Sequence, residues 1–188
     1  MIKIGITGSL SSGKTTASKI LSLRRGPLFS ADKAVKEIYQ NKNFKSLIVK
    51  KFRIKNQNQI KISLRKLILK NKENIKRLEK IIHPLVRKKM KNFTSQNRNK
   101  RFLFYEIPLL IESKLMKHFN IIIYIKAKKK LRLKRFQSKR GNKKLFYLFN
   151  NKQMKDKQKI KFCDHVVVNE NNLSVLKKNL LDIIESYE

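Results

Sequence analysis

The sequence has few of the residues on which several classes of protein depend. Only one of its 188 residues is cysteine, and none is tryptophan. The single cysteine, Cys163, cannot form an intrachain disulfide or a cysteine metal cluster, which excludes a disulfide-stapled domain and fits a reducing compartment. We expect Cys163 to be a small core residue. Since no apolar run is long enough to span a bilayer and no signal-peptide pattern is present, we expect a soluble protein of the cytoplasm.

Acidic residues are also scarce, with 12 Asp and Glu against 48 Lys and Arg and a net charge of +36. Such a charge usually indicates nucleic acid or an anionic membrane as the partner. Here the lysines are spread over the whole chain and accompany many Ile, Asn and Phe, with only 5 Gly and 3 Pro, as A/T-rich codon usage produces. The runs Lys126–Lys130 and Lys155–Lys161 lack interleaved aromatic residues. We therefore expect only nonspecific contact with nucleic acid, and no membrane partner.

One motif points to a specific chemistry. Residues 8–15 read Gly-Ser-Leu-Ser-Ser-Gly-Lys-Thr after the apolar run Ile2 to Ile6, and they match the phosphate-loop pattern G-x-x-x-x-G-K-[ST]. Glycines allow positive φ and close backbone approach, so N–H groups can cradle phosphates at a helix N-terminus. An ordinary strand-to-helix turn would not need Lys14. We predict binding of ATP and Mg²⁺, with Thr15 as metal ligand, by Gly8, Ser9, Leu10, Ser11, Ser12, Gly13, Lys14, Thr15 and Thr16.

Short apolar runs alternate with helical stretches, which predicts an α/β fold of the P-loop NTPase type, a five-stranded parallel sheet with flanking helices. The expected strands are Ile2–Thr7, Leu28–Ser30, Phe102–Ile107, Ile121–Ile125 and His165–Val168. The length favours a single domain with one core. We expect the core at residues 1–32, 100–137 and 160–188, a helical insertion that binds the second substrate at 33–99, and a lid at 138–155.

Three carboxylates follow expected strands. Asp32 comes just after the second strand, where it would face an acceptor hydroxyl at the carboxyl edge of the sheet and take its proton. The alternative is an N-cap for a helix over Lys33–Tyr39, and position alone does not decide between the two. Glu106 ends the third strand and could bind Mg²⁺ through water. Glu112 could simply be solvated.

The ordered motifs resemble the dephospho-coenzyme A kinase family, from Gly5 to Asn169. The most discriminating element is Pro-Leu-Leu-x-Glu within Ile107–Glu112, and the others are the phosphate loop, Ala31-Asp32, Leu78-Glu79, Ile82-His83-Pro84 and Asp164–Asn169. The resemblance implies MgATP-dependent phosphorylation of the ribose 3′-hydroxyl of dephospho-coenzyme A. The products would be coenzyme A and ADP, in the last step of coenzyme A biosynthesis.

The resemblance also implies roles for single residues. Asp32 would be the catalytic base, assisted by Lys14 and by Arg140 of the lid. Arg135 matches the first lid arginine, and Asn169 would lie near the adenine of ATP. Besides Asp32, the residues expected to bind the acceptor are Lys61, His83, Pro108 and Leu109.

The chain departs from the family pattern at several positions. The second lid arginine falls on Lys139, and we assign its role to the adjacent Arg140 because a guanidinium clamps phosphate oxygens bidentately. Lys61 and Ser30 stand where Arg and Asp are usual. Ser9 and Ser11 replace glycines, which is tolerable if both keep negative φ. Arg132 is expected to be a solvated helix residue.

Two other functions stay open at this point. One is another small-molecule or nucleoside monophosphate kinase of the same fold, which the Pro-Leu-Leu-x-Glu element argues against. The other is a basic nucleic-acid-binding protein with a vestigial phosphate loop, which the intact Lys14 and Thr15 argue against. The sequence makes no prediction of the oligomeric state.

Overall fold

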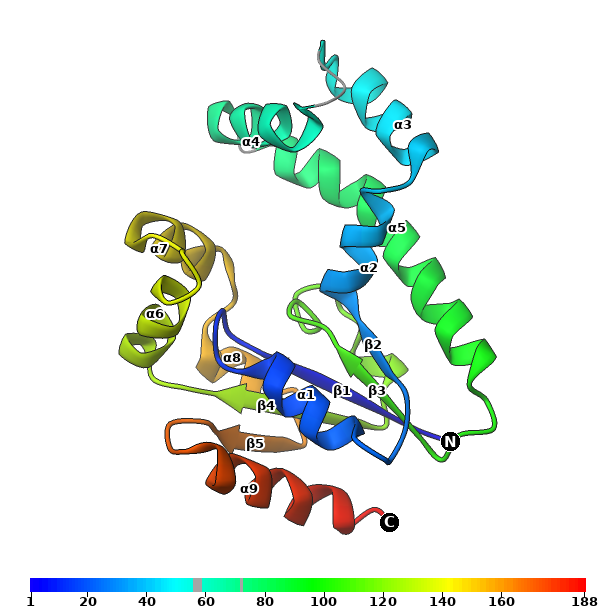
Figure 1. The fold of residues 1–188 in the computed structure, drawn as a ribbon, viewed down its shortest axis with the longest axis vertical. Coiled ribbons are helices and arrows are strands. Elements are labelled where there is room, and N and C mark those ends of the chain that lie inside the picture. Colours follow the sequence, from blue (N-terminus) through cyan, green and yellow to red (C-terminus); the bar gives the residue numbers. More distant parts are fainter. Residues whose placement is uncertain (56–58, 72) are drawn as a thin grey trace. The chain divides into compact units, whose positions relative to one another are not determined.

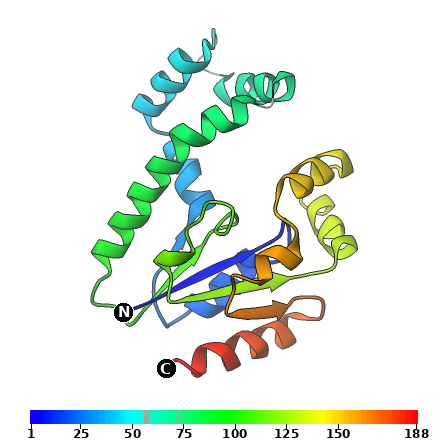
Figure 2. The same cartoon turned by 180° about the vertical axis from the view of Figure 1, so that it is seen from behind.

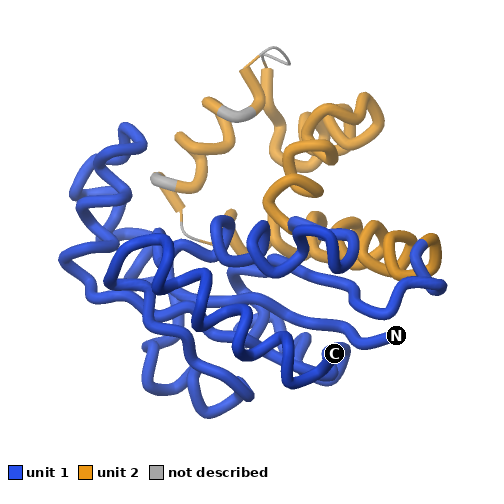
Figure 3. The backbone as a smooth tube through the Cα atoms, turned by 60° about the horizontal axis from the view of Figure 1, so that its bottom comes forward, with its two compact units in different colours: residues 1–30, 97–188 blue, residues 31–96 orange. Residues whose placement is uncertain are grey.

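The computed structural model describes residues 1–55, 59–71 and 73–188, and the side chains of Lys61 and Leu69 also lie outside the description. The chain divides into two compact units, residues 1–30 with 97–188 and residues 31–96, which Figure 3 colours separately. Each unit has a hydrophobic core of its own. The second unit spans most of the segment predicted as a helical insertion.

The first unit is built on a five-stranded sheet with the strand order β2-β3-β1-β4-β5 (Figure 1). Every neighbouring pair is parallel. The strands are β1 (Ile2–Gly8), β2 (Leu28–Ser30), β3 (Phe102–Glu106), β4 (Ile121–Lys126) and β5 (His165–Val168). Strands buried on both faces read as continuous apolar runs, which is why the sequence located them. The predicted five-stranded parallel α/β sheet is confirmed.

Helices cover both faces of this sheet. On one face, α1 and α9 bury Leu21, Leu180 and Ile184 against the apolar side chains of β1, β3 and β4. On the other face lie α8 and the turn that follows β3 (Figure 2). The helices are α1 (Lys14–Ser22), the 3₁₀ helix η2 (Met116–His118), α6 (Lys129–Gln137), α7 (Lys143–Lys152), α8 (Asp156–Ile160) and α9 (Leu173–Glu185).

The second unit consists of helices: α2 (Ala31–Ile38), α3 (Lys42–Phe52), α4 (Ile60–Lys70) and α5 (Glu73–Gln96). Phe44, Ile48 and Phe52 recur every four residues along α3, so one face of that helix is apolar and buried. They share a core with Ile38, Ile54, Ile60, Leu64 and Ile82. In the described part of the chain, no helix is both long and apolar enough to cross a membrane.

The register of the sheet brings the ends of three strands to one edge. Glu106 at the end of β3 lies opposite Ile6 of β1 on one side and opposite Ser30 of β2 on the other. Gly8, the last residue of β1, lies opposite Ile125 of β4. Ligands of open parallel sheets bind beyond the carboxyl ends of the strands, so this edge is where a site is expected.

Candidate functional site

The segment between β1 and α1 has the backbone that its two glycines were predicted to allow. Gly8 has φ 152° and Gly13 has φ 100°, conformations that residues with a side chain rarely adopt. A Cβ on Gly8 would collide with the carbonyl oxygen of Ile125, and one on Gly13 would collide with Nδ2 of Asn169. Both positions therefore require glycine.

Within the described residues, helix α1 begins without a side-chain cap, unlike α7 and α9. The N-cap residues Asn142 of α7 and Asn172 of α9 accept a hydrogen bond from a backbone N–H of their helix. The N-cap of α1 is Gly13, and no side chain in the described part of the chain caps that helix. The N–H groups of its first turn, which contains Lys14, Thr15 and the exposed Thr16, can therefore be offered to an anion.

The two serines that replace usual glycines, Ser9 and Ser11, differ in conformation. Ser9 meets the condition of negative φ under which serine is tolerable there, but Ser11 has φ 58° and does not meet it. A left-handed conformation costs a residue with a Cβ roughly 1–2 kcal/mol. The residues on either side of Ser11 are held by hydrogen bonds, which explains how the loop keeps this conformation.

Lys14 and Thr15 are both engaged in the loop. Lys14 is buried, and its Nζ donates to the carbonyl oxygen of Ser9 at 2.8 Å. Thr15 Oγ1 donates to Oε1 of the buried Glu106 at 2.5 Å. A cation, a hydroxyl and a carboxylate thus meet at the N-terminus of α1. Hydroxyl and carboxylate oxygens are ligands that Mg²⁺ prefers.

Asn169 and Arg135 contact the second half of the loop. Asn169, just after β5, donates from Nδ2 to the carbonyl oxygen of Ser12 at 2.8 Å. Arg135 of α6 donates from Nη1 to the carbonyl oxygen of Asn169 at 3.0 Å and to that of Ser12 at 3.4 Å. Two of the predicted nucleotide-binding residues, more than 120 positions from the loop, therefore lie against it.

Arg132 corrects a prediction. It was expected to be solvated, but it is only 5% exposed. Its guanidinium donates to Oδ1 of Asn150 at 2.7 Å and to the carbonyl oxygens of Ala127 at 3.1 Å and Leu10 at 3.3 Å. Periodicity within α6 could not reveal this, since the acceptors lie on other segments of the chain.

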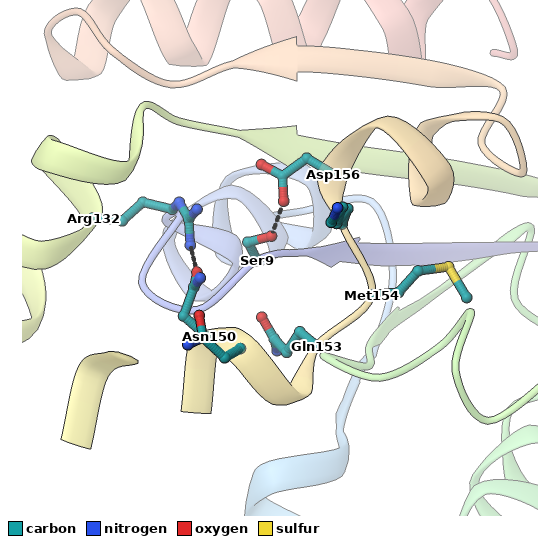
Figure 4. A pocket seen from close by; sticks show the side chains of 8 residues that line it. Ser9, Arg132, Asn150, Gln153, Met154 and Asp156 are labelled. Atoms are coloured by element: carbon teal, nitrogen blue, oxygen red, sulfur yellow. Dashed lines mark hydrogen bonds between the residues drawn. The ribbon is translucent and has the colours of Figure 1, made fainter. Parts of the chain in front are cut away.

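Three further residues at the loop were missed from the sequence. Leu10 N donates to Gln153 Oε1 at 2.9 Å, and the Ser9 hydroxyl bonds both to Asp156 and, at 3.0 Å, to the Tyr124 hydroxyl. Figure 4 shows Ser9 facing Asp156 and Arg132 facing Asn150. A polar residue in a lysine-rich segment carries no sequence signal of such a contact.

The turn after β3 carries two predicted acceptor-binding residues. Pro108 and Leu109 are half-buried there, and the Pro108 carbonyl oxygen accepts from Thr7 Oγ1 at 3.2 Å. Glu112, for which the sequence left solvation as a possibility, lies with Oε1 2.6 Å from Nζ of Lys159, whose side chain is 0% exposed. This ion pair ties the turn to α8.

Glu112→Ala is expected to lower the free energy of unfolding by about 3 kcal/mol, because it leaves the Lys159 ammonium buried without its counter-charge. Urea unfolding of the purified variant measures the change. Glu37→Ala is the matched control: Glu37 lies 2.8 Å from Lys89 in an exposed pair, which lowers the pKa of Glu37 but should contribute under about 1 kcal/mol. Equal losses in the two variants would contradict the burial argument.

The remaining predicted site residues do not contact the phosphate loop through any hydrogen bond found in the described structure. In the second unit, Asp32 is exposed in the first turn of α2, which begins at Ala31, so Asp32 is not the N-cap of that helix. His83 is half-buried in α5, and the side chain of Lys61 in α4 lies outside the described residues. In the first unit, Arg140 is exposed at φ 63° after α6, and within the described structure its guanidinium has no hydrogen bond or ion pair.

Cys163 was predicted to be a core residue, but it is only half-buried. Its Sγ donates to the carbonyl oxygen of Lys159 at 3.3 Å. Burial, followed by the charge of Asp164, raises the pKa of the Cys163 thiol to about 12. The thiol therefore stays protonated and unreactive at neutral pH.

Comparison with known proteins agrees with this geometry. The family model for dephospho-CoA kinase (CoaE) matches residues 2–174. A dephospho-CoA kinase of Bartonella quintana (strain Toulouse) is 33% identical over 188 residues, covering 97% of this chain and 96% of the relative. The solved dephospho-CoA kinase from Campylobacter jejuni has a TM-score of 0.69 at 27% identity, covering 98% of this chain and 96% of its own. TT1252 from Thermus thermophilus shares the fold, with a TM-score of 0.85 at 24% identity over 100% of this chain and 98% of its own. The chain belongs to the dephospho-CoA kinase family, enzymes that phosphorylate dephospho-CoA in the last step of coenzyme A biosynthesis.

Proposed function

We propose that this chain transfers the γ-phosphoryl group of ATP to the 3′-hydroxyl of the ribose of dephospho-CoA, with coenzyme A and ADP as products. The observation that carries the proposal is the glycine-capped start of α1, with Lys14 and Thr15 in its first turn and Glu106 bonded to Thr15. Such an arrangement supplies N–H donors and one cation to a polyphosphate. The family membership supports dephospho-CoA as the acceptor.

Asp32 is the proposed base. The 3′-hydroxyl gives its proton to the Asp32 carboxylate as its oxygen bonds to the γ-phosphorus, and the bond from that phosphorus to the leaving oxygen of ADP breaks. Asp32 follows β2 directly and its side chain is exposed. An exposed carboxylate is available to a substrate from solvent.

Cationic side chains are proposed to neutralise the transferred group. Lys14 would move its ammonium from the Ser9 carbonyl oxygen to the β and γ phosphates, since a charged phosphate is the stronger acceptor. Arg135 and Arg140 are proposed as further phosphate contacts, and Asn169 as a neighbour of the adenine. His83, Lys61, Pro108 and Leu109 are proposed to line the acceptor site.

The residues at the start of α1 fit a magnesium ion. Thr15 and Glu106 supply a hydroxyl and a carboxylate within hydrogen-bond distance of each other, and Thr15 keeps lone pairs for a metal while donating its proton to Glu106. Mg²⁺ held there together with ATP would offset the negative charge of the phosphates. We propose Thr15 as the ligand and Glu106 as the residue that orients it.

Thr15→Val should lower the gain in ADP affinity that Mg²⁺ provides by about 10-fold or more, as loss of residues around metal sites typically does. Titration calorimetry of ADP with Mg²⁺ and with a chelator measures the gain without any turnover. Thr15→Ser keeps the hydroxyl and is expected to retain the gain. An undiminished gain in Thr15→Val would remove Thr15 from the proposed metal site.

The acceptor is tested by coupled ADP release with MgATP. Dephospho-CoA is compared with AMP, other nucleosides and no acceptor, and the phosphorylated position of the product is determined. Turnover confined to dephospho-CoA with phosphate on the 3′-oxygen is the expected result. Turnover only with another acceptor would leave the fold in place and refute the proposed substrate.

A further inference from the structure

The segment that joins α7 to α8 lies against the first half of the phosphate loop. We define the α7–α8 connector as residues 153–156, the last of which, Asp156, is also the first residue of α8. Gln153 Oε1 accepts from the N–H of Leu10 at 2.9 Å, and Asp156 accepts from the hydroxyl of Ser9. Two successive residues of the loop are therefore held by two side chains of one short segment. Figure 4 shows one of these contacts, between Ser9 and Asp156.

The hydrogen bonds of Ser9 run in one direction. A carboxylate only accepts, so the Ser9 hydroxyl donates to Asp156 and accepts from the Tyr124 hydroxyl at 3.0 Å. Tyr124 is 0% exposed, and this burial holds the pKa of its phenol well above the usual range. Tyr124 therefore keeps the proton that it donates, and the Ser9 side chain is fixed from both sides.

Both backbone groups of Leu10 are held as well. Its N–H donates to Gln153, and its carbonyl oxygen accepts from Nη1 of Arg132 at 3.3 Å. Arg132 is itself buried and bonded to Asn150 at 2.7 Å. The peptide groups before and after Leu10 are thus oriented by side chains of the protein, with no nucleotide needed to orient them.

The connector is also hydrogen-bonded to Glu112 of the turn after β3. Met154 N donates to Glu112 Oε1 at 3.2 Å, and Glu112 pairs with the buried Lys159. Where the connector faces the loop lies a cavity of about 440 Å³, lined by Ser9, Arg132, Asn150, Asn151, Gln153, Met154, Lys155 and Asp156.

The residue next to these contacts is the strained one. Ser11 has φ 58°, and a serine keeps such a conformation only where the surroundings impose it. Leu10 before it is held by Gln153 and Arg132, and the Ser12 carbonyl oxygen after it accepts from Asn169. Release of Leu10 would let Ser11 return to negative φ and turn the following N–H groups away.

We propose that Gln153 and Asp156 are positioning residues for the polyphosphate of the nucleotide. They hold Ser9 and Leu10 so that Ser11 keeps its left-handed conformation before the nucleotide arrives. The inference rests on nucleotide binding by this loop, as in the proposed function, but not on the identity of the acceptor. A preorganised loop binds its ligand more tightly because less order is imposed on binding.

The first test combines substitutions at Gln153 and Ser11 and measures the Kd for ADP by calorimetric titration with MgADP. Gln153→Ala should raise the Kd for ADP about fivefold, the worth of one hydrogen bond. In a Ser11→Gly background the same change should raise it less than about twofold, because glycine adopts φ 58° without cost. An equal rise in both backgrounds would overturn the proposal. Failure of the wild-type chain to bind ADP would refute the proposed function instead, and this inference with it.

The second test compares Asp156→Ala with Asp156→Asn, which remove the same charge but differ in the oxygen that accepts from Ser9. Asp156→Asn should keep the Kd for MgADP within about twofold, and Asp156→Ala should raise it about tenfold. Equal affinities in the two variants would show that only the charge matters and would overturn the assignment. The exposed Asp182 of α9 supplies the control Asp182→Asn, for which no change is expected.

Discussion

Asp32→Asn is expected to lower kcat by about 10²- to 10⁴-fold, the usual contribution of a general base, while the KM for ATP changes by less than about twofold. The amide has the shape of the carboxylate but cannot take the proton of the 3′-hydroxyl. Asp32 is exposed in the first turn of α2, so the substitution should cost little stability. Steady-state kinetics with varied ATP and saturating dephospho-CoA measures both parameters.

A structural role of Asp32 would produce a different result. A carboxylate in the first turn of a helix stabilises it by about 0.3–1 kcal/mol through the helix dipole. If that were its only role, Asp32→Asn would lower the unfolding midpoint slightly and leave kcat unchanged. Equal damage to kcat and to ATP binding would also remove Asp32 from the chemical step. Glu73, in the first turn of α5, supplies the matched control Glu73→Gln.

Lys14→Met is expected to lower kcat/KM by about 10³-fold or more, because electrostatic groups aimed at the charge of the transition state are worth 10²–10³-fold or greater in a buried site. Methionine is one atom shorter than lysine and fills most of the buried position of Lys14 without its charge. The Kd for MgADP should also rise, since Lys14 contacts the β phosphate as well as the γ phosphate in the proposed complex. Kinetics and calorimetry together measure both effects.

Lys19→Met on the exposed side of the same helix is the control for loss of one positive charge. Since the net charge is +36, loss of one lysine would hardly change a general electrostatic attraction for the nucleotide. Comparable losses in the two variants would mean that Lys14 acts only through this general attraction. A loss confined to Lys14→Met assigns the effect to the geometry of the loop.

The elements that the sequence predicted well depend on local rules. The runs at Ile121–Lys126 and Phe102–Glu106 are strands because apolar residues buried on both faces leave an unbroken pattern. Gly8 and Gly13 were identified because the conformations that they adopt exclude other residues. The family followed from motifs whose order and spacing can be read along one chain.

Sequence reasoning did not find contacts between residues that are distant in the sequence. Arg132 was taken for a solvated residue, but its acceptors Asn150 and Leu10 come from other segments. The sequence indicated no partner for Glu112, because its partner Lys159 lies 47 positions further along the chain. The sequence did not reveal that Ser11 has φ 58°, nor that its neighbours Leu10 and Ser12 are bonded to the distant Gln153 and Asn169.

By itself the sequence determined the parallel sheet, the phosphate loop and the family, because strand periodicity, glycine stereochemistry and motif spacing act over short distances along the chain. Only the tertiary structure decided which charges are buried and which side chains hold the loop, since a lysine-rich sequence offers many equivalent donors and just a few scarce acceptors. Packing selects among them: Lys159 is buried on Glu112, whereas Lys89 meets Glu37 at the surface. The cost of leaving a buried charge or polar group unpaired, and not any local preference, makes that selection.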